Sequence, residues 1–362
     1  MSNRFPVARF HDVSSGGLGA SGTLGASSAP NVSNAPSTTI SPITPITPIT
    51  PITPTSPISP MTHGAGGGSG AAGPLVVKLG GAAVDDPAKS PELWDALCAM
   101  HEAHPAGLVL VHGGAAMVDR QLARLGHVTQ RRDGIRVTPP DQIDDIVSVL
   151  AGTVNTALVG WLRSVGAPAV GLCLGDGGLC RVRRTKRFSF DPGCVGEIVG
   201  GDAKVVDALL GADFLPVLCS IGLDDDGEPL NVNADEAAAG IAGLIGASGL
   251  LLLTDVPGVR GADGRVIESL DAASIERLIA EGVITGGMIP KVRGALDAAR
   301  TAGIAATIAS WNNPDDLLRI GRGERAGTRV LPPASTSGAL LDEPELPALA
   351  SCAQALTGTS GR

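Results

Sequence analysis

The stretch Leu75-Val76-Val77-Lys78-Leu79-Gly80-Gly81 decides the fold, because it leads from an apolar strand through one lysine into a glycine turn. A nearly continuous apolar run is typical of a strand that is covered on both faces of a parallel sheet. Paired glycines let the backbone turn sharply and expose N–H groups beside the cation, which together form a cradle for phosphate oxygens. The stretch therefore predicts a phosphate site at the carboxyl end of a buried strand.

A second lysine has a similar setting much later in the chain. Lys291 ends the stretch Gly286-Gly287-Met288-Ile289-Pro290-Lys291, and a helical pattern continues behind it. Phosphoryl transfer depends largely on positioning and charge stabilisation, which two lysines on either side of a phosphoryl group would supply. The chain contains no Walker A pattern and no H-R-D catalytic loop, so the sequence predicts a phosphotransferase of another design.

Composition divides the 362 residues into three parts. Residues 1–73 are rich in Ser, Thr, Pro and Gly, and prolines recur at every third position from Pro42 to Pro60. We expect a disordered extension there, with a semi-stiff Pro-Ile-Thr spacer. Residues 74–331 have the composition of an ordinary globular domain, and residues 332–362 are expected to form a disordered tail.

Charge and cysteine usage exclude several functions. The formal net charge of −9 argues against a nucleic-acid partner, which favours a basic face. The six cysteines form no C-x-x-C pair and lie beside no histidine cluster, so neither a disulfide framework nor a protein-built metal site is expected. We expect no membrane association, because no apolar run reaches transmembrane length and no apolar segment follows Met1. A cytoplasmic location follows, and the serine-rich, acid-poor residues 1–39 leave an organellar transit segment as the alternative.

Strand patterns alternate with helical patterns through the globular part. The expected strands are Leu75–Leu79, Leu108–Val111, Ala169–Leu174, Leu215–Cys219, Leu250–Leu253, Ala306–Ala309 and Thr328–Leu331. This alternation favours an α/β fold with a mainly parallel sheet that is covered on both faces. An Asp-Gly turn signal within residues 131–137 predicts a hairpin beside the sheet. Lys78, His112 and Asp255 fall at carboxyl ends of strands, where open α/β sheets bind ligands.

Several short motifs each allow a functional and a structural interpretation. Gly113-Gly114 after a strand brings N–H groups close to a ligand, or simply makes a tight connection to a helix. We expect His112 to be a packed or hydrogen-bonded histidine. Arg136 could hold a carboxylate with two hydrogen bonds, or be a solvated surface charge.

Two motifs in the second half are also ambiguous alone. Residues 231–236, Asn-Val-Asn-Ala-Asp-Glu, precede a run of small residues that predicts a helix. They are either caps of this helix or groups that orient lysines or bind an anionic substrate. Residues 250–259 lead from a buried strand into a Pro-Gly turn, which is either a nucleotide loop or an ordinary turn.

Taken in order, the motifs resemble those of the amino-acid kinase family. The match runs from about Leu75 to Leu331 and includes Lys78–Gly81, Val111–Gly114, Asp133–Thr138, Asn231–Asp235, Thr254–Gly258 and Gly287–Val292. It is most similar to the branch that phosphorylates the γ-carboxylate of N-acetyl-L-glutamate with ATP, the second step of arginine biosynthesis. The resemblance implies a three-layer α/β/α sandwich around a mainly parallel sheet, with substrate in the N-terminal half and ATP with Mg²⁺ in the C-terminal half.

The resemblance also implies roles for individual residues. Lys78 and Lys291 would stabilise the transferring phosphoryl group, and Asp235 would orient both lysines. The substrate-binding residues would be Gly80, Gly81, Gly114, Ala115, Arg136 and Asn231. The nucleotide site would be lined by Asp255, Val256, Pro257, Gly258, Val259, Arg260, Val283, Ile284 and Thr285. A γ-carboxylate, with a pKa of about 4.3, is already ionised at neutral pH and needs no general base.

The chain departs from the family pattern in three places. Ala115 replaces the usual third glycine of its loop. The region before the first strand is rich in Pro and Gly, and the His-rich arginine-site pattern is missing after Trp311. We therefore expect an arginine-insensitive homodimer, joined through the helix after Asp141. The long flanks have no counterpart in the family.

Two alternatives to the implied activity stay open. One is a related carboxylate kinase that acts on acetylaminoadipate, since a slightly longer acid fits a slightly larger pocket. The other is a non-catalytic module that senses acetylglutamate or a nucleotide.

Overall fold

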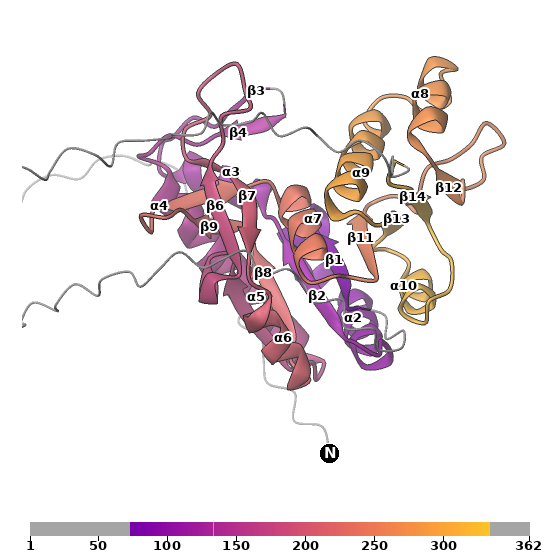
Figure 1. The fold of residues 1–362 in the computed structure, drawn as a ribbon, viewed down its shortest axis with the longest axis horizontal. Helices are drawn as coiled ribbons and strands as arrows, with labels where there is room; N and C mark the ends of the chain where they lie inside the picture. Colours follow the sequence, from indigo (N-terminus) through magenta and orange to yellow (C-terminus); the bar gives the residue numbers. More distant parts are fainter. Residues whose placement is uncertain (1–72, 133, 334–362) are drawn as a thin grey trace, which may run out of the picture. The chain divides into compact units, whose positions relative to one another are not determined.

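The computed structural model describes residues 73–132 and 134–333 (Figure 1). The predicted proline-rich spacer, the alternative transit segment and nearly all of the predicted tail lie outside the described residues. The predicted domain boundaries therefore stay predictions.

Helices and strands alternate along most of the described chain. The helices are α1 (Ala82–Asp85), α2 (Pro91–Ala103), α3 (Ala115–Arg124), α4 (Ile143–Val147), α5 (Asn155–Ser164), α6 (Lys204–Gly211), α7 (Ala234–Leu244), α8 (Ala272–Ala280), α9 (Met288–Ala302) and α10 (Pro314–Gly321), with short 3₁₀ turns at η1 (Pro87–Lys89) and η3 (Asp176–Gly178) and a π-helical segment at η2 (Ser148–Val154). The strands are β1 (Leu75–Leu79), β2 (Leu108–His112), β3 (Gln130–Arg132), β4 (Ile135–Val137), β5 (Ala169–Cys173), β6 (Cys180–Arg184), β7 (Val195–Gly201), β8 (Leu215–Cys219), β9 (Ile221–Leu223), β10 (Pro229–Val232), β11 (Gly249–Thr254), β12 (Ser269–Leu270), β13 (Ala306–Ser310) and β14 (Thr328–Val330).

An eight-stranded sheet organises the chain, in the order β12-β14-β13-β11-β1-β2-β8-β5. Neighbouring strands are parallel except β13 and β14, which are antiparallel. All seven expected strands belong to this sheet, with ends that differ by one residue at most. The predicted α/β fold around a mainly parallel sheet is confirmed. Strand β1 lies between β2 of the N-terminal half and β11 of the C-terminal half. The strands of the two halves therefore extend the sheet in opposite directions from β1, and Lys78 lies at this switch point.

Two cores explain why the strands are apolar on both faces. Val76 packs with side chains of α7 and α9, whereas Leu75 and Val77 pack on the opposite face with those of α2, α5 and α10. Because side chains alternate along a strand, Lys78 falls on the same face as Val76. Helix α7 packs against β1, β11 and α9, and Figure 1 shows it beside β1. The helix that begins at Ala234 is therefore brought next to Lys78.

A second sheet, with four strands in the order β6-β7-β10-β9, lies in the N-terminal half. The sequence prediction missed β6, β7, β9 and β10, because their sequences carry arginines, glycines and a proline rather than continuous apolar runs. Strands β3 and β4 form the predicted antiparallel hairpin, which is confirmed.

Helix α4, segment η2 and helix α5 form one continuous run of 22 residues, Ile143–Ser164, which contains an 18-residue window with a mean hydropathy of 1.4. By length and composition this run could cross a membrane, so the expectation that no apolar run reaches such a length is wrong. Charged residues near both ends hide the run when the sequence is read for an unbroken apolar stretch. Leu158 and Leu162 pack into the core under the sheet, and the core helix of a soluble protein meets the same test.

Candidate active site

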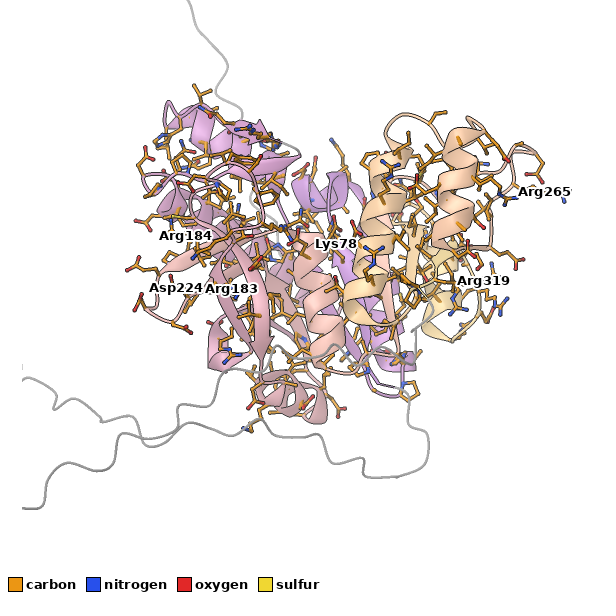
Figure 2. All side chains as sticks on the ribbon, turned by 45° about the horizontal axis from the view of Figure 1, so that its top comes forward. Lys78, Arg183, Arg184, Asp224, Arg265 and Arg319 are labelled. Atoms are coloured by element: carbon orange, nitrogen blue, oxygen red, sulfur yellow. The ribbon has the colours of Figure 1, made fainter. Side chains whose placement is uncertain are left out.

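Two clefts at the carboxyl ends of the central strands share one wall. The first, of about 250 Å³, lies in the N-terminal half, and the second, of about 540 Å³, lies in the C-terminal half. Lys78, Gly80, Gly81 and Asp235 line both clefts. Figure 2 shows Lys78 between the two halves of the ribbon. A ligand in one cleft can therefore meet a ligand in the other at these four residues.

Lys78 is held close to the shared wall by its neighbours. Its side chain is 17% exposed, and its Nζ lies 3.0 Å from Oδ1 of Asp235. A Cβ atom at Gly80 would lie 2.8 Å from this Nζ, so glycine leaves the space that the ammonium group occupies. Gly81 has a φ of 59°, which favours glycine, and it precedes α1. The two glycines thus serve different purposes, space and backbone conformation.

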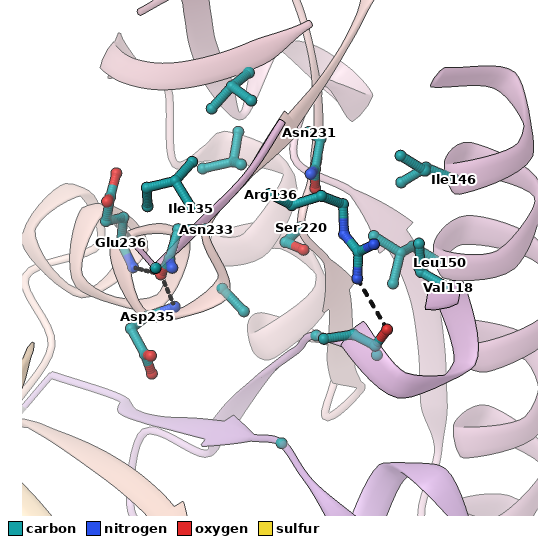
Figure 3. A pocket seen from close by; sticks show the side chains of 18 of the residues that line it. Val118, Ile135, Arg136, Ile146, Leu150, Ser220, Asn231, Asn233, Asp235 and Glu236 are labelled. Carbon is teal, nitrogen blue, oxygen red and sulfur yellow. Dashed lines mark hydrogen bonds between the residues drawn. The ribbon is translucent and has the colours of Figure 1, made fainter. Parts of the chain in front are cut away.

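Asp235 comes from the first turn of α7, whose N-terminus faces the first cleft. Oδ1 of Asn233 accepts hydrogen bonds from the N–H groups of Asp235 and Glu236, at 2.9 and 3.2 Å (Figure 3). The cap interpretation therefore holds for Asn233, whereas the carboxylate of Asp235 is free to contact Lys78. All three residues line the first cleft.

Lys291 lies in the first turn of α9 and forms an ion pair with Asp255, which follows β11. The hydrogen bond from Lys291 lowers the pKa of the Asp255 carboxyl group. The resemblance implies that Asp235 orients both lysines, but in the structure Asp235 contacts Lys78 and Asp255 contacts Lys291. Both lysines line the second cleft.

Arg136, on β4, points into the first cleft from the hairpin (Figure 3). Its side chain is 9% exposed, and Nη1 donates to Oδ1 of Asp119 at 2.6 Å. Nη2 donates to the carbonyl oxygen of Ala115 at 3.0 Å. Burial raises the pKa of Asp119, but hydrogen bonds from Arg136 and Arg131 outweigh it and bring the pKa to about 2. A carboxylate that is ionised at neutral pH therefore orients the guanidinium group.

The loop after β2 holds Ala115, where the family pattern has a third glycine, without backbone strain. Ala115 is the first residue of α3, and within residues 73–132 and 134–333 the only non-glycine residue with positive φ is Asp213. Ala115 therefore needs no backbone conformation reserved for glycine. A Cβ atom at Gly114 would lie 3.0 Å from Cδ2 of Leu150, so close packing favours glycine there.

Further residues of the first cleft escaped sequence reasoning. Asn231, which was predicted, lines this cleft, and its Nδ2 donates to Oγ1 of Thr138 at 3.2 Å. Ser220 and Arg187 also line the cleft but were not predicted. Ser220 follows β8 directly, so the rule that ligands bind at carboxyl ends of strands could have found it. Arg187 lies in the connection between β6 and β7, where no motif marks it.

A third cleft, of about 160 Å³, lies in the C-terminal half. Apart from Asp255 and Pro257, it contains all the residues predicted for the nucleotide: Val256, Gly258, Val259, Arg260, Val283, Ile284 and Thr285, together with Met288. Asp255 lines the second cleft, and Pro257 is not among the lining residues of either. Gly294 and Trp311, which were not predicted, also line the second cleft.

The described residues hold no group of three or more His, Cys, Asp or Glu side chains that could bind a metal ion. The two acidic residues that line the second cleft, Asp235 and Asp255, are each paired with a lysine. Mg²⁺ commonly keeps several waters and binds through substrate phosphates with few protein ligands. This donor set fits a Mg²⁺ ion that arrives with a nucleotide.

Comparison with known proteins agrees with this geometry. Residues 73–310 match the model of the amino acid kinase family. The chain is 43% identical over 259 residues to proteins named acetylglutamate kinase from Aliivibrio fischeri strains MJ11 and ATCC 700601 / ES114. The alignment with each covers 72% of this chain and 98% of the relative.

Solved structures show the same fold. The crystal structure of smu.665 from Streptococcus mutans UA159 matches with a TM-score of 0.54 and 26% identity, over 71% of this chain and 98% of that chain. N-acetylglutamate synthase from Neisseria gonorrhoeae, solved with coenzyme A and N-acetyl-glutamate, matches with a TM-score of 0.58 and 22% identity. That alignment covers 72% of this chain and 59% of the synthase, and it supports the fold alone.

Proposed function

The chain belongs to the amino-acid kinase family, and from this premise we propose that it is an acetylglutamate kinase. It transfers the γ-phosphoryl group of ATP to the γ-carboxylate of N-acetyl-L-glutamate, in arginine biosynthesis. The observation that carries the proposal is the shared wall, where Lys78 and Asp235 line both a cleft of the N-terminal half and a cleft of the C-terminal half. Two substrates bound in these clefts meet at a lysine.

The reaction needs charge stabilisation rather than a base. A carboxylate oxygen of the substrate attacks the γ-phosphorus, the bond from phosphorus to the β–γ bridging oxygen breaks, and ADP leaves with the bonding electrons. The product is N-acetyl-L-glutamyl 5-phosphate. Because the attacking carboxylate is already ionised at neutral pH, the main barrier is repulsion between two anions.

Lys78 and Lys291 offset this repulsion from two sides. Lys78 comes from the wall shared by the clefts, and Lys291 comes from α9 on the nucleotide side. Their ion pairs with Asp235 and Asp255 hold the ammonium groups in place until a phosphoryl group arrives. The N–H groups of Gly80 and Gly81 bind oxygens of the reacting groups.

Arg136 and Asn231 bind the substrate in the first cleft. Arg136 is mostly buried and has Asp119 as a fixed partner, so its guanidinium group is oriented before substrate binds. Gly114 and Ala115 add backbone contacts from the start of α3. This arrangement suits a small acid with more than one anionic or amide group.

ATP occupies the second and third clefts. The turn after β11 and the residues before α9 line the third cleft, and Lys291 lines the second. Mg²⁺ bound to the phosphates would supply further positive charge, and the chain itself contributes lysines and backbone N–H groups.

We extend the proposal to assembly and control. The run Ile143–Ser164 is apolar, yet only 39% of its most apolar window is buried within one chain, which supports a homodimer joined through this helix. The sequence before β1 is rich in Pro and Gly up to Pro74, a composition that disfavours the N-terminal helix of arginine-inhibited family members. This composition supports an enzyme that arginine does not inhibit. Sedimentation of the full chain as a monomer would contradict the dimer. A cytoplasmic location stays a prediction, with import through residues 1–39 as the alternative.

Release of ADP by the full chain tests the activity. With ATP and Mg²⁺, we expect turnover with N-acetyl-L-glutamate and much less with acetylaminoadipate, and no change on adding arginine. Preference for acetylaminoadipate would support the related carboxylate kinase instead. Binding of either ligand without any ADP release would support a sensing module.

A further inference from the structure

A buried histidine lies beside the glycine loop of the first cleft and takes no part in the chemistry described above. His112 is the last residue of β2, and its side chain is 0% exposed. It precedes Gly113 and Gly114, which line the cleft. As expected from the sequence, the ring is packed and hydrogen-bonded, and its partners determine how the loop is held.

The hydrogen-bond partners determine which ring nitrogen carries the proton. Nδ2 of Asn155 lies 2.9 Å from the carbonyl oxygen of Val217 and 3.0 Å from Nε2 of His112. Because a carbonyl oxygen only accepts, the amide nitrogen of Asn155 must face Val217 and donate. The same amide nitrogen faces Nε2, so Nε2 accepts and is unprotonated. The proton of the neutral ring is then on Nδ1, which lies 2.8 Å from the carbonyl oxygen of Gly113.

Packing keeps the ring neutral and in place. Burial lowers the pKa of His112 to about 4, although the hydrogen bond to Gly113 acts in the opposite direction. Asn155 is also buried, and strand β5 makes room for it at Gly171, where a Cβ atom would lie 2.0 Å from Oδ1 of Asn155. Four elements, β2, α5, β5 and β8, therefore hold this pair of side chains.

The hydrogen bond to Gly113 sets the direction of the next N–H group. In a trans peptide the C=O and the following N–H point in opposite directions, and the described residues contain no cis peptide. A carbonyl of Gly113 that is held on the buried side therefore turns the N–H of Gly114 away from the core. Within the part of the chain that the structure describes, this N–H has no protein acceptor.

We propose that His112, held by Asn155, is a positioning residue that directs the Gly114 N–H at the anionic oxygens of the bound substrate. The inference rests on the proposed function for the identity of that substrate. It does not rest on it for the protonation of the ring, which can be measured in the free protein.

Nitrogen-15 NMR of the full chain, labelled at histidine, tests the protonation state without any substitution. The signals of His112 are assigned by their loss in His112→Asn. At pH 7 we expect a proton on Nδ1 and none on Nε2. A proton on Nε2 would overturn the inference, whether or not the protein phosphorylates N-acetyl-L-glutamate.

Two similar substitutions then separate positioning from packing. In His112→Asn the amide nitrogen can take the place of Nδ1, whereas in His112→Gln it takes the place of Nε2. We expect His112→Gln to lower kcat/KM for N-acetyl-L-glutamate about tenfold or more, as for one lost hydrogen bond to a charged group. KM for ATP should change by less than about twofold, and His112→Asn should restore most of the loss.

A histidine in the connection between α2 and β2 provides the control. His104 precedes β2, lies near Oγ of Ser248 at 3.4 Å, and lines none of the three clefts. His104→Gln should leave both kinetic constants unchanged. Equal losses in His112→Asn and His112→Gln, or a parallel rise in KM for ATP, would overturn the inference. If the wild-type protein itself shows no turnover, the proposed function fails, and the NMR measurement still tests the protonation of the ring on which the inference depends.

Discussion

At the scale of single residues, the site depends on a cation at the wall shared by two clefts. Lys78→Ala should lower kcat about 10²- to 10³-fold, because the ammonium group stabilises charge that develops only during transfer. KM for N-acetyl-L-glutamate should change much less, since Arg136 holds the substrate elsewhere. Steady-state kinetics of the full chain measures both.

Lys204 offers a control for this substitution. It is an exposed lysine that is also paired with an aspartate, Asp202, at 2.7 Å. Lys204→Ala should therefore leave kcat unchanged. A Lys78→Ala enzyme with wild-type kcat would show that the assigned role of Lys78 is wrong.

A single methyl group should disturb the same cation. The Cβ atom of Gly80→Ala would lie 2.8 Å from Nζ of Lys78 and would displace the ammonium group from Asp235. We expect kcat to fall about tenfold, the cost of about 1.4 kcal/mol of lost transition-state stabilisation. Gly211→Ala, at the end of α6 where an added Cβ meets no atom within 4 Å, is the matched control. Equal kcat values for the two variants would contradict this account of Gly80.

Some residue-scale features are local and others exist only in the folded chain. Lys78 and Gly80 could be predicted because a strand, a cation and a turn are adjacent in the sequence. The ion pair between Lys291 and Asp255 could not, since it depends on where α9 lies relative to β11. Ser220 and Arg187 likewise reach the first cleft only through the pairing of strands.

At the scale of elements, the packing of helix α7 positions one side of the site. Its run of small residues, Ala237–Gly240, lets it pack closely against β1 and α9. This close approach brings the first turn of α7, with Asp235, next to Lys78. The small-residue run signals tight packing in the sequence, but the partner of the helix had to come from the structure.

The cap of α7 should therefore matter for both stability and catalysis. Asn233→Ala should lower the free energy of unfolding by about 1 kcal/mol, the typical value of an N-cap. Because the cap also sets the first turn, kcat should fall as well. Denaturant unfolding and kinetics of the same preparation measure the two effects.

Helix α8 supplies a comparison without a link to the site. Oδ1 of Asp271 caps α8 by accepting from the N–H of Ser274 at 2.7 Å. Asp271→Ala should have a similar cost in stability and leave kcat unchanged. If both cap variants lose activity equally, the loss reflects stability rather than the position of Asp235.

At the scale of the whole molecule, one sheet joins two halves with different tasks. The strands of both halves were predictable because each is an apolar run that the sheet buries on both faces. The smaller sheet was not, since its strands β6 and β7 are half exposed and their arginines and glycines mask the alternation. That sheet and the hairpin β3–β4 complete the N-terminal half, which is why the first cleft was harder to predict than the shared wall.

Stability against acid is a property of this whole structure, and His112 should contribute to it. Its pKa is about 4 in the folded protein because of burial, whereas an unfolded histidine has a pKa of about 6.5. The unfolded state therefore binds more protons between these values, so stability should fall as the pH falls from about 6.5 to 4. The shift corresponds to about 3 kcal/mol at most. The pKa of Asp119, lowered to about 2, adds a loss of stability of the same sign at still lower pH, below about 4.

Denaturant unfolding of the wild type and of His112→Asn between pH 6.5 and 4 isolates the contribution of the histidine, because the variant lacks its titration. We expect the variant to show the flatter curve, and parallel curves would mean that His112 does not change protonation on unfolding.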